Sequence, residues 1–399
     1  MRVLFIAGAC PYPPNSGGTL RTYNLLKQLC ARHEITLVSP CAPGVDLHAA
    51  FDTRLCRLIS IDDVPLGVVG KLASLFSPLP YIVKAHENPA LNVAVEQALS
   101  SDDFDLVHCD SISVVKSIPS QDQIPTVFNS HNVEAVIWER YLENERRIWM
   151  RPILRSQLAK VSSYESLLPE MFDCCVAVSE NDRFEMQRRY GAGCVVVVPN
   201  GVDLEYYCSI PDSDKPELLY VGSLDWTPNQ DAVRWLIESI MPRVRLAIPN
   251  AHLSIVGRKP PSWMRSLCDK CAVTLYADVP DVRPYLADSS LVVVPLRIGG
   301  GSRLKILEAM AAGRCVVSTS IGAEGLELSA GHEIVIADDP ADFARECISL
   351  LVDPIRRQLV AASGRTKVES EYGWDGVAHD MEHAWERALR RFEVLEARG

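Results

Sequence analysis

The sequence lacks any apolar run long enough to cross a membrane. Of its 399 residues, 48% are hydrophobic and 23% are charged, as in ordinary globular proteins. No stretch reaches the roughly 18 unbroken apolar residues that a spanning helix needs. The opening MRVLFIAGACPYPP has one basic residue and three prolines, which we interpret as a strand and a loop, not a secretory signal. These features favour a cytoplasmic protein, with at most peripheral contact at the inner membrane face.

Excess positive charge and a disulfide pattern are also absent. The formal net charge is −11, and nucleic-acid binders normally show a basic face, so nucleic acid is not an expected partner. The 13 cysteines are scattered along a long chain, which is typical of reduced thiols and not of a disulfide framework. If the ligand is a phosphate ester, the positive charge that it requires must be supplied locally.

What the sequence does contain is an alternation of strands and helices. Near-continuous apolar runs followed by helical stretches predict parallel sheets covered on both faces. We therefore expect an α/β fold of two Rossmann-like α/β/α domains in tandem. The predicted strands are 2–7, 34–39, 104–108, 126–130, 174–179, 194–199, 217–222, 252–257, 273–277, 291–296 and 315–319.

The domain boundaries follow from a change of composition. Residues 199–216 are rich in proline and other turn formers, which predicts a linker. It separates a first domain over 1–198 from a second domain over 217–373. The remaining helix, 374–399, is expected to pack back onto the first domain. Each domain has a crevice at the carboxyl ends of its strands, and we expect a ligand in a cleft between the two.

The most informative segment is the loop that follows the strand at 291–296. Glycines allow the backbone to approach a ligand closely, and the helix that begins near Arg303 offers unpaired N–H groups and a partial positive charge. Arg303 and Lys305 add full positive charges, which a helix start does not need for its own stability. Together these features predict a phosphate site. The loop consists of Gly299, Gly300, Gly301 and Ser302, with Ser302 expected as the N-cap.

Spacing on this helix separates the roles of its charged residues. Lys305 and Glu308 are three residues apart and share a face. Arg303 and Lys305 are two apart, so Arg303 must act from the loop or the first turn if both contact one ligand. Glu308 offers two acceptor oxygens one turn beyond the phosphate end, which suits the paired hydroxyls of a ribose. An ordinary strand–loop–helix with a solvated charged face is the alternative.

This segment resembles the donor-sugar motif of the family 4 retaining glycosyltransferases, which have the GT-B fold. Further motifs agree with that family in order and spacing over essentially the whole chain. They are the early glycine pair, SHNVE (130–134), CVAVSENDR (175–183), VVPNGVD (197–203), LLYVGSLDWTPN (218–229), LSIVGRKP (253–260), ADVPDVRPYLADSSLVVVPL (277–296) and IGAEGLE (321–327).

Two positions depart from the family pattern. The family often has two glutamates eight residues apart in the donor motif, and here Gly300 stands where the first would be. It also commonly has a basic pair after the first strand of the second domain, where this chain has Ser223 and, near the lysine position, Asn229. We interpret Arg303 and Lys305 as replacements for the missing cations.

The resemblance also implies site residues outside the donor loop. Gly17 and Gly18, in the loop after the first strand, would approach the donor phosphate and the acceptor. His131 would contact the donor sugar and orient the reacting groups, whereas Glu134 is expected to begin a helix. Substrate contacts are also implied for Ser223 and Val279.

The resemblance therefore implies a retaining, metal-independent transferase without a cofactor. It would move a sugar from a nucleotide-diphosphate donor, UDP by default, to a small-molecule, glycan or lipid-linked acceptor. The alternatives are a sugar-nucleotide epimerase of GT-B fold and a non-catalytic sugar-nucleotide-binding relative. A mass-spectrometric assay with an acceptor extract separates the three.

Other motifs point to no metal site. Asp103 and Asp105 precede a strand and are expected to cap a turn. Cys268 and Cys271 form one C-x-x-C pair without the second half that zinc needs, and His379 and His383 have no evident third ligand. Two segments could touch a membrane or an acceptor, the basic amphipathic stretch 145–160 and the apolar stretch 65–83.

Overall fold

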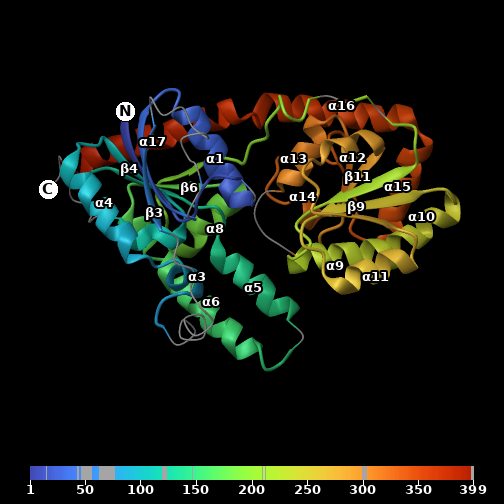
Figure 1. Cartoon of the computed structure of the whole chain (residues 1–399), viewed down its shortest axis with the longest axis horizontal. Coiled ribbons are helices and arrows are strands. Elements are labelled where there is room, and N and C mark those ends of the chain that lie inside the picture. Colours follow the sequence, from blue (N-terminus) through green and yellow to red (C-terminus); the bar gives the residue numbers. More distant parts are fainter. Residues whose placement is uncertain are drawn as a thin grey trace. The chain divides into compact units, whose positions relative to one another are not determined.

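The computed structural model describes most of the chain (Figure 1). Of the predicted site, Gly299, Gly300, Gly301 and Ser302 lie outside the described residues, as does most of the apolar stretch 65–83. None of the helices in the described ranges combines the length and apolar character that a membrane crossing requires. The described ranges are 1–14, 16–42, 45, 56–62, 77–118, 124–145, 147–208, 210–211, 213–298 and 303–396.

The chain divides into two compact units. The first comprises Met1–Asn200 together with Trp374–Gly399, and the second comprises Gly201–Gly373. Much of the expected linker packs within the second unit, where Val202 is buried and Ile210 N–H donates to the carbonyl of Ala312.

The first unit is built on a parallel sheet of seven described strands in the order β3-β2-β1-β4-β5-β6-β7. Its strands are β1 (Arg2–Ala7), β2 (Glu34–Cys41), β3 (Cys56–Asp62), β4 (Leu106–Asp110), β5 (Thr126–Asn129), β6 (Cys174–Ala177) and β7 (Val195–Val197). Its helices are α1 (Gly17–Leu29), α3 (Tyr81–Ala85), α4 (Pro89–Ser101), η1 (Ile112–Ser117), α5 (Glu134–Asn144), α6 (Arg151–Glu165), α7 (Leu168–Met171), α8 (Glu180–Tyr190) and α17 (Trp374–Glu396).

Helix α17 belongs to the core of this first unit. It packs against α1 and strand β6, and its Trp385 is fully buried. The Trp385 indole N–H donates to Nδ1 of His108 in β4 over 3.1 Å. An apolar stripe along the helix, with Val377, Met381 and Trp385 on one side, explains why this face is buried.

The second unit repeats the same topology with six described strands in the order β10-β9-β8-β11-β12-β13. Its strands are β8 (Glu217–Val221), β9 (His252–Gly257), β10 (Thr274–Ala277), β11 (Leu291–Val294), β12 (Cys315–Ser318) and β13 (Val335–Ile336). Its helices are α9 (Thr227–Trp235), the π-helical η2 (Leu236–Ile240), α10 (Met241–Ala247), α11 (Ser262–Lys270), α12 (Arg283–Asp288), α13 (Leu304–Ala311), α14 (Ser320–Ala323), α15 (Pro340–Val352) and α16 (Pro354–Glu371).

Both strand orders reverse direction next to the first strand of the unit. In such sheets, ligands bind outside the carboxyl ends of the strands at that reversal. In the first unit this point lies between β1 and β4, and in the second it lies between β8 and β11. The fold therefore predicts a ligand site at this point of each unit.

Three local expectations differ from the structure. Gly17 and Gly18 are not in a loop but open helix α1, because Ser16 caps it by accepting from the backbone N–H of Thr19. The N-cap position of α13, which we expected for Ser302, is occupied by Arg303. Strands β3 and β13 were not predicted, because β3 is half exposed and β13 has two residues.

Candidate functional site

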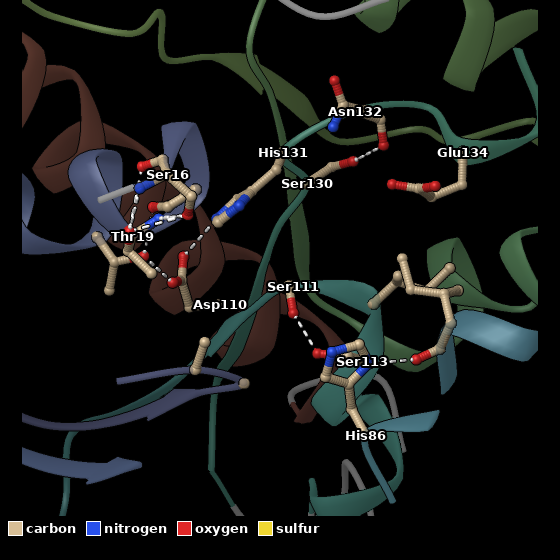
Figure 2. A pocket seen from close by; sticks show the side chains of 16 residues that line it. Ser16, Thr19, His86, Asp110, Ser111, Ser113, Ser130, His131, Asn132 and Glu134 are labelled. Atoms are coloured by element: carbon tan, nitrogen blue, oxygen red, sulfur yellow. Dashed lines mark hydrogen bonds and ion pairs between the residues drawn. The ribbon is translucent and has the colours of Figure 1, made fainter. Parts of the chain in front are cut away.

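The candidate site of the first unit is centred on a histidine and a carboxylate from neighbouring strands. Asp110 ends β4, and His131 follows β5. Nε2 of His131 lies 2.9 Å from Oδ1 of Asp110, and Figure 2 shows the two side chains pointing toward each other. A carboxylate only accepts, so Nε2 of His131 carries the hydrogen of this bond.

Asp110 is fully buried and is held by two further donors. The hydroxyl of Thr22 donates to Oδ2 over 2.5 Å, and the Asn129 amide donates to Oδ1 over 2.6 Å. Burial alone raises the pKa of Asp110, but the charge and hydrogen bond of His131 and the nearby His108, whose Nε2 lies 3.9 Å from Oδ1, hold that pKa well below its ordinary value. Asp110 is therefore a carboxylate at neutral pH.

A buried arginine ties this cluster to the end of the first sheet. Arg21 in α1 is 1% exposed, and it contacts the same Asn129 that donates to Asp110. Its position predicts that the segment after β7 and the Asp110 cluster form one rigid hydrogen-bonded group. The guanidinium donates to Val198 O over 2.8 Å, Pro199 O over 2.7 Å, Asn200 Oδ1 over 3.0 Å and Asn129 Oδ1 over 3.2 Å.

A pocket of about 230 Å³ opens beside this cluster at the reversal of the strand order. Gly18 lines it, whereas Gly17 is exposed and is not among the lining residues. Ser111 has φ 121°, a backbone conformation that a non-glycine residue adopts only under strain and that is concentrated at functional sites. The lining comes from segments after β1, β4 and β5 and from the start of α1, and includes Gly8, Ala9, Ser16, Gly18, Thr19, Asp110, Ser111, Ser113, Ser130, His131, Asn132 and Glu134.

Glu134 reaches the same pocket from the start of α5 (Figure 2). Burial and the charge of Glu165 raise the pKa of Glu134 to about 7. The Glu165 carboxylate, from α6, caps α5 by accepting from the backbone N–H groups of Glu134 over 2.8 Å and Ala135 over 3.1 Å. The pocket thus holds a carboxyl group that titrates near neutral pH.

The second unit presents a half-buried ammonium at the equivalent point of its sheet. Lys305, in the first turn of α13, reaches the carboxyl end of β8. Its Nζ lies 3.0 Å from Asn229 Oδ1 and 3.3 Å from the Tyr220 hydroxyl. Both of these hydrogen-bond partners are neutral, and the charges that act on the ammonium are those of Arg303 and Glu308. Burial and then the charge of Arg303 lower the pKa of Lys305 to about 7.

A glycine makes room for this ammonium. A Cβ added at Gly222 would lie 2.8 Å from Lys305 Nζ and 3.0 Å from Asn229 Nδ2. Asn229 is itself oriented, because its amide donates to the Ser223 carbonyl over 2.7 Å and its oxygen accepts from Tyr220 over 2.7 Å. The segment from Gly222 to Asn229 thus has no charged side chain at the positions where the resemblance led us to expect cations. The ammonium of Lys305, from α13, occupies that space instead.

The other predicted residues of the second unit are arranged around Lys305. Arg303 is 5% exposed at the N-cap of α13, close enough to influence the pKa of Lys305. Burial raises the pKa of Glu308, while a hydrogen bond from Tyr207 and the charge of Lys305 act in the opposite direction. These three charged residues therefore form one cluster at the start of α13.

Two predicted contacts are less central. The Ser223 hydroxyl accepts from Arg258 over 3.2 Å, and Val279 packs at the edge of the second core. The sequence interpretation missed Asp110, Arg21 and Tyr220. Asp110 had a signal, since a carboxylate ending a buried strand lies at the functional edge of a parallel sheet.

Comparisons with known proteins agree with this architecture. Residues 15–206 match the model of Glycosyltransferase Family 4, and residues 215–353 match that of Glycosyl transferases group 1. A protein of the cps region of Klebsiella pneumoniae is 22% identical and covers 87% of this chain and 90% of its own length. A GDP-mannose-dependent phosphatidylinositol monomannoside mannosyltransferase of Corynebacterium glutamicum is 30% identical over 45% of this chain and 52% of its own length.

Solved structures share the fold at lower sequence identity. Sucrose-phosphate synthase from Thermosynechococcus elongatus superposes with a TM-score of 0.76 at 17% identity, covering 98% of this chain and 99% of its own. Anabaena HepE in complex with UDP-glucose superposes with a TM-score of 0.65 at 14% identity, covering 97% of this chain and 99% of its own. The two family models between them match most of the chain. The protein therefore belongs to the family 4 and group 1 glycosyltransferases and has their GT-B fold of two Rossmann-like domains.

Proposed function

We propose that this glycosyltransferase moves a sugar from a nucleoside-diphosphate donor to an acceptor, with retention of anomeric configuration and without a metal ion. UDP is the default nucleoside diphosphate, because a HepE structure of the same fold holds UDP-glucose. The mannosyltransferase relative depends on GDP-mannose, which makes GDP the first competitor to test. The 13 cysteines are free thiols, which supports action in a reducing cytoplasm.

The observation that carries the proposal is the environment of Lys305. A partly buried ammonium costs free energy unless an anion compensates it. The hydrogen-bond partners of Lys305 in the described residues are neutral oxygens, those of Tyr220 and Asn229, and Glu308 acts on it only through its charge. A diphosphate bound at the start of α13 would supply the missing negative charge. The helix N-terminus would add its own attraction for the same anion.

The electrostatic demand of glycosyl transfer matches this cluster. Negative charge develops on the departing diphosphate as the glycosidic bond breaks, and preorganised cations stabilise it most where water is excluded. Lys305 and Arg303 would supply that stabilisation, and each charge-assisted hydrogen bond contributes about 1.5–3 kcal/mol. Glu308 would accept from the ribose hydroxyls.

We assign the pocket of the first unit to the acceptor and the reacting sugar. With Nε2 of His131 bonded to Asp110, Nδ1 is left to accept from or donate to a sugar hydroxyl. Asp110 acts through His131 and is a positioning residue. By the family's chemistry, the acceptor attacks on the face that the diphosphate leaves, with no covalent intermediate on the enzyme.

The test begins with donor binding and ends with product. Purified protein is titrated with UDP and GDP by calorimetry, and is then incubated with sugar nucleotides and an acceptor extract for mass spectrometry. We expect one nucleoside diphosphate to bind and a new glycoside to form. Lys305→Met should abolish both, while Lys270→Met, at an exposed lysine of the same unit, should change neither.

Three results would overturn the proposal. An isomeric sugar nucleotide without a glycoside would identify an epimerase. Nucleotide binding without any product would identify a non-catalytic relative. Equal binding by Lys305→Met and the parent would remove the Lys305 ammonium from the donor site.

A further inference from the structure

Helices α5 and α6 form a hairpin whose turn exposes large apolar side chains. The two helices pack against each other, and in Figure 1 they extend together away from the sheet of the first unit. At the turn, Ile148 is 82% exposed and Trp149 is 68% exposed, and Ile153 follows in the first turn of α6 at 37%. Scattered exposed apolar residues are ordinary, but a cluster at a projecting point marks an interaction site.

The turn and most of α6 carry a charge opposite to that of the chain as a whole. Residues 145–160 contain five basic residues and one acidic residue, in a chain of net charge −11. The one acidic residue, Glu145, forms an ion pair with Arg147 over 2.7 Å. Its backbone carbonyl accepts a hydrogen bond from Arg151 over 3.1 Å. Arg155 is exposed one turn after Arg151 on the same face.

We propose that residues 147–155, the hairpin tip, dock onto an anionic lipid surface. Tryptophan prefers the boundary between headgroups and acyl chains, and isoleucine inserts below it. Arginines around such an apolar point gain from negatively charged headgroups.

The hairpin links this surface to the pocket described above. Glu134, which lines the pocket, is the first residue of α5. Helix α5 has 11 residues and is therefore about 16 Å long, so the tip lies roughly one helix length from the pocket. If the proposed function holds, this arrangement selects an amphiphilic acceptor whose polar head leaves the membrane and reaches the pocket.

The experiment uses the full chain and vesicles, without any substrate. Protein is co-sedimented with vesicles of phosphatidylcholine alone and of phosphatidylcholine mixed with phosphatidylglycerol. We expect binding to the mixed vesicles that weakens as salt is raised, and little binding to neutral ones. The double variant Ile148→Ser/Trp149→Ser and the single variant Arg155→Glu should each weaken binding by about tenfold or more.

Matched controls come from the same unit. Phe184 is 60% exposed on α8, and Lys27 is exposed on α1. Phe184→Ser and Lys27→Glu should bind vesicles as the parent does. Lipids with brominated acyl chains should quench the tryptophan fluorescence of the parent on binding, and Trp149→Phe should bind but lose most of that quenching.

The outcomes are distinct. Vesicle binding that the tip variants leave unchanged, or no binding to the mixed vesicles, would overturn the proposal. A parent dimer that the tip variants dissociate would instead assign the tip to a second copy of the chain. The affinity for UDP, measured by calorimetry, should be the same in the tip variants and the parent. If neither the parent nor the variants bound UDP, that result would count against the proposed function and not against membrane docking.

Discussion

A Cβ atom placed on Gly18 would lie 3.2 Å from Nδ1 and 3.6 Å from Cε1 of His131. The first turn of α1 therefore lies close to the Nδ1–Cε1 edge of the imidazole whose Nε2 is bonded to Asp110, and the absence of a side chain at Gly18 leaves room for the ring. This relationship joins two residues that the sequence interpretation selected separately.

Gly18→Ala should lower turnover without loss of stability. The added methyl group displaces the ring from Asp110, whereas alanine within a helix is favoured over glycine by up to about 1 kcal/mol. We expect a reduced kcat with an unchanged or higher thermal midpoint. Gly376→Ala in α17, where a Cβ would meet nothing within 4 Å, is the control and should retain full activity. Full activity of Gly18→Ala would show that the position of the ring is unimportant.

Asp110→Asn tests whether the carboxylate positions His131. An amide in its place no longer fixes the hydrogen on Nε2, so we expect kcat to fall by about a hundredfold while UDP affinity is retained, and the pH profile of kcat to shift. Asp105→Asn, just before the start of the same strand, is the matched control and should behave as the parent. A parallel loss of UDP affinity in Asp110→Asn would make Asp110 a structural residue only.

The lowered pKa of Lys305 predicts that the protein takes up a proton when the donor binds. Because its pKa is about 7 in the free protein, the side chain is mostly neutral at higher pH, and a bound diphosphate favours the charged form. UDP affinity should therefore fall as pH rises above about 7.5, where the diphosphate is already ionised. Calorimetry in buffers of different ionisation enthalpy measures the proton directly. A Lys305→Met variant that still bound UDP with the same uptake would assign the proton to another group.

Glu308→Gln separates ribose recognition from phosphate recognition. The variant should bind UDP at least about tenfold more weakly, because a charged acceptor forms stronger hydrogen bonds than a neutral one. Inorganic pyrophosphate, which has no ribose, should bind both proteins equally. A matching loss for pyrophosphate would mean that Glu308 acts through Lys305 and not on the nucleoside.

The raised pKa of Glu134 predicts that the stability of the protein depends on pH. Its folded pKa of about 7 lies above the ordinary glutamate value of 4.5, so between these values the folded protein binds more protons than the unfolded chain. The contribution of Glu134 to the free energy of unfolding therefore falls as pH rises from about 4.5 to about 7. Above pH 7 the folded protein bears the full cost of the ionised carboxylate. Glu134→Gln removes this cost and should be more stable than the parent at pH 8 by at least about 1 kcal/mol, with a smaller gain at pH 5.

Thermal unfolding at both pH values measures the effect. Glu143→Gln, at an exposed glutamate of the same helix, is the control and should show no such difference. Equal gains for Glu134→Gln at the two pH values would contradict the assigned titration.

The alternating α/β architecture could be predicted from the amino-acid sequence, because buried parallel strands need unbroken apolar runs such as RVLFIA and LVVVPL. The sequence also marked His131, Lys305 and Glu308, through local spacing and position after a strand. Only the tertiary structure brought Asp110 to His131 and carried Lys305 to Asn229, since these contacts join residues 21 and 76 positions apart. A contact between separate strands depends on strand order and register, which hydrophobic periodicity does not encode.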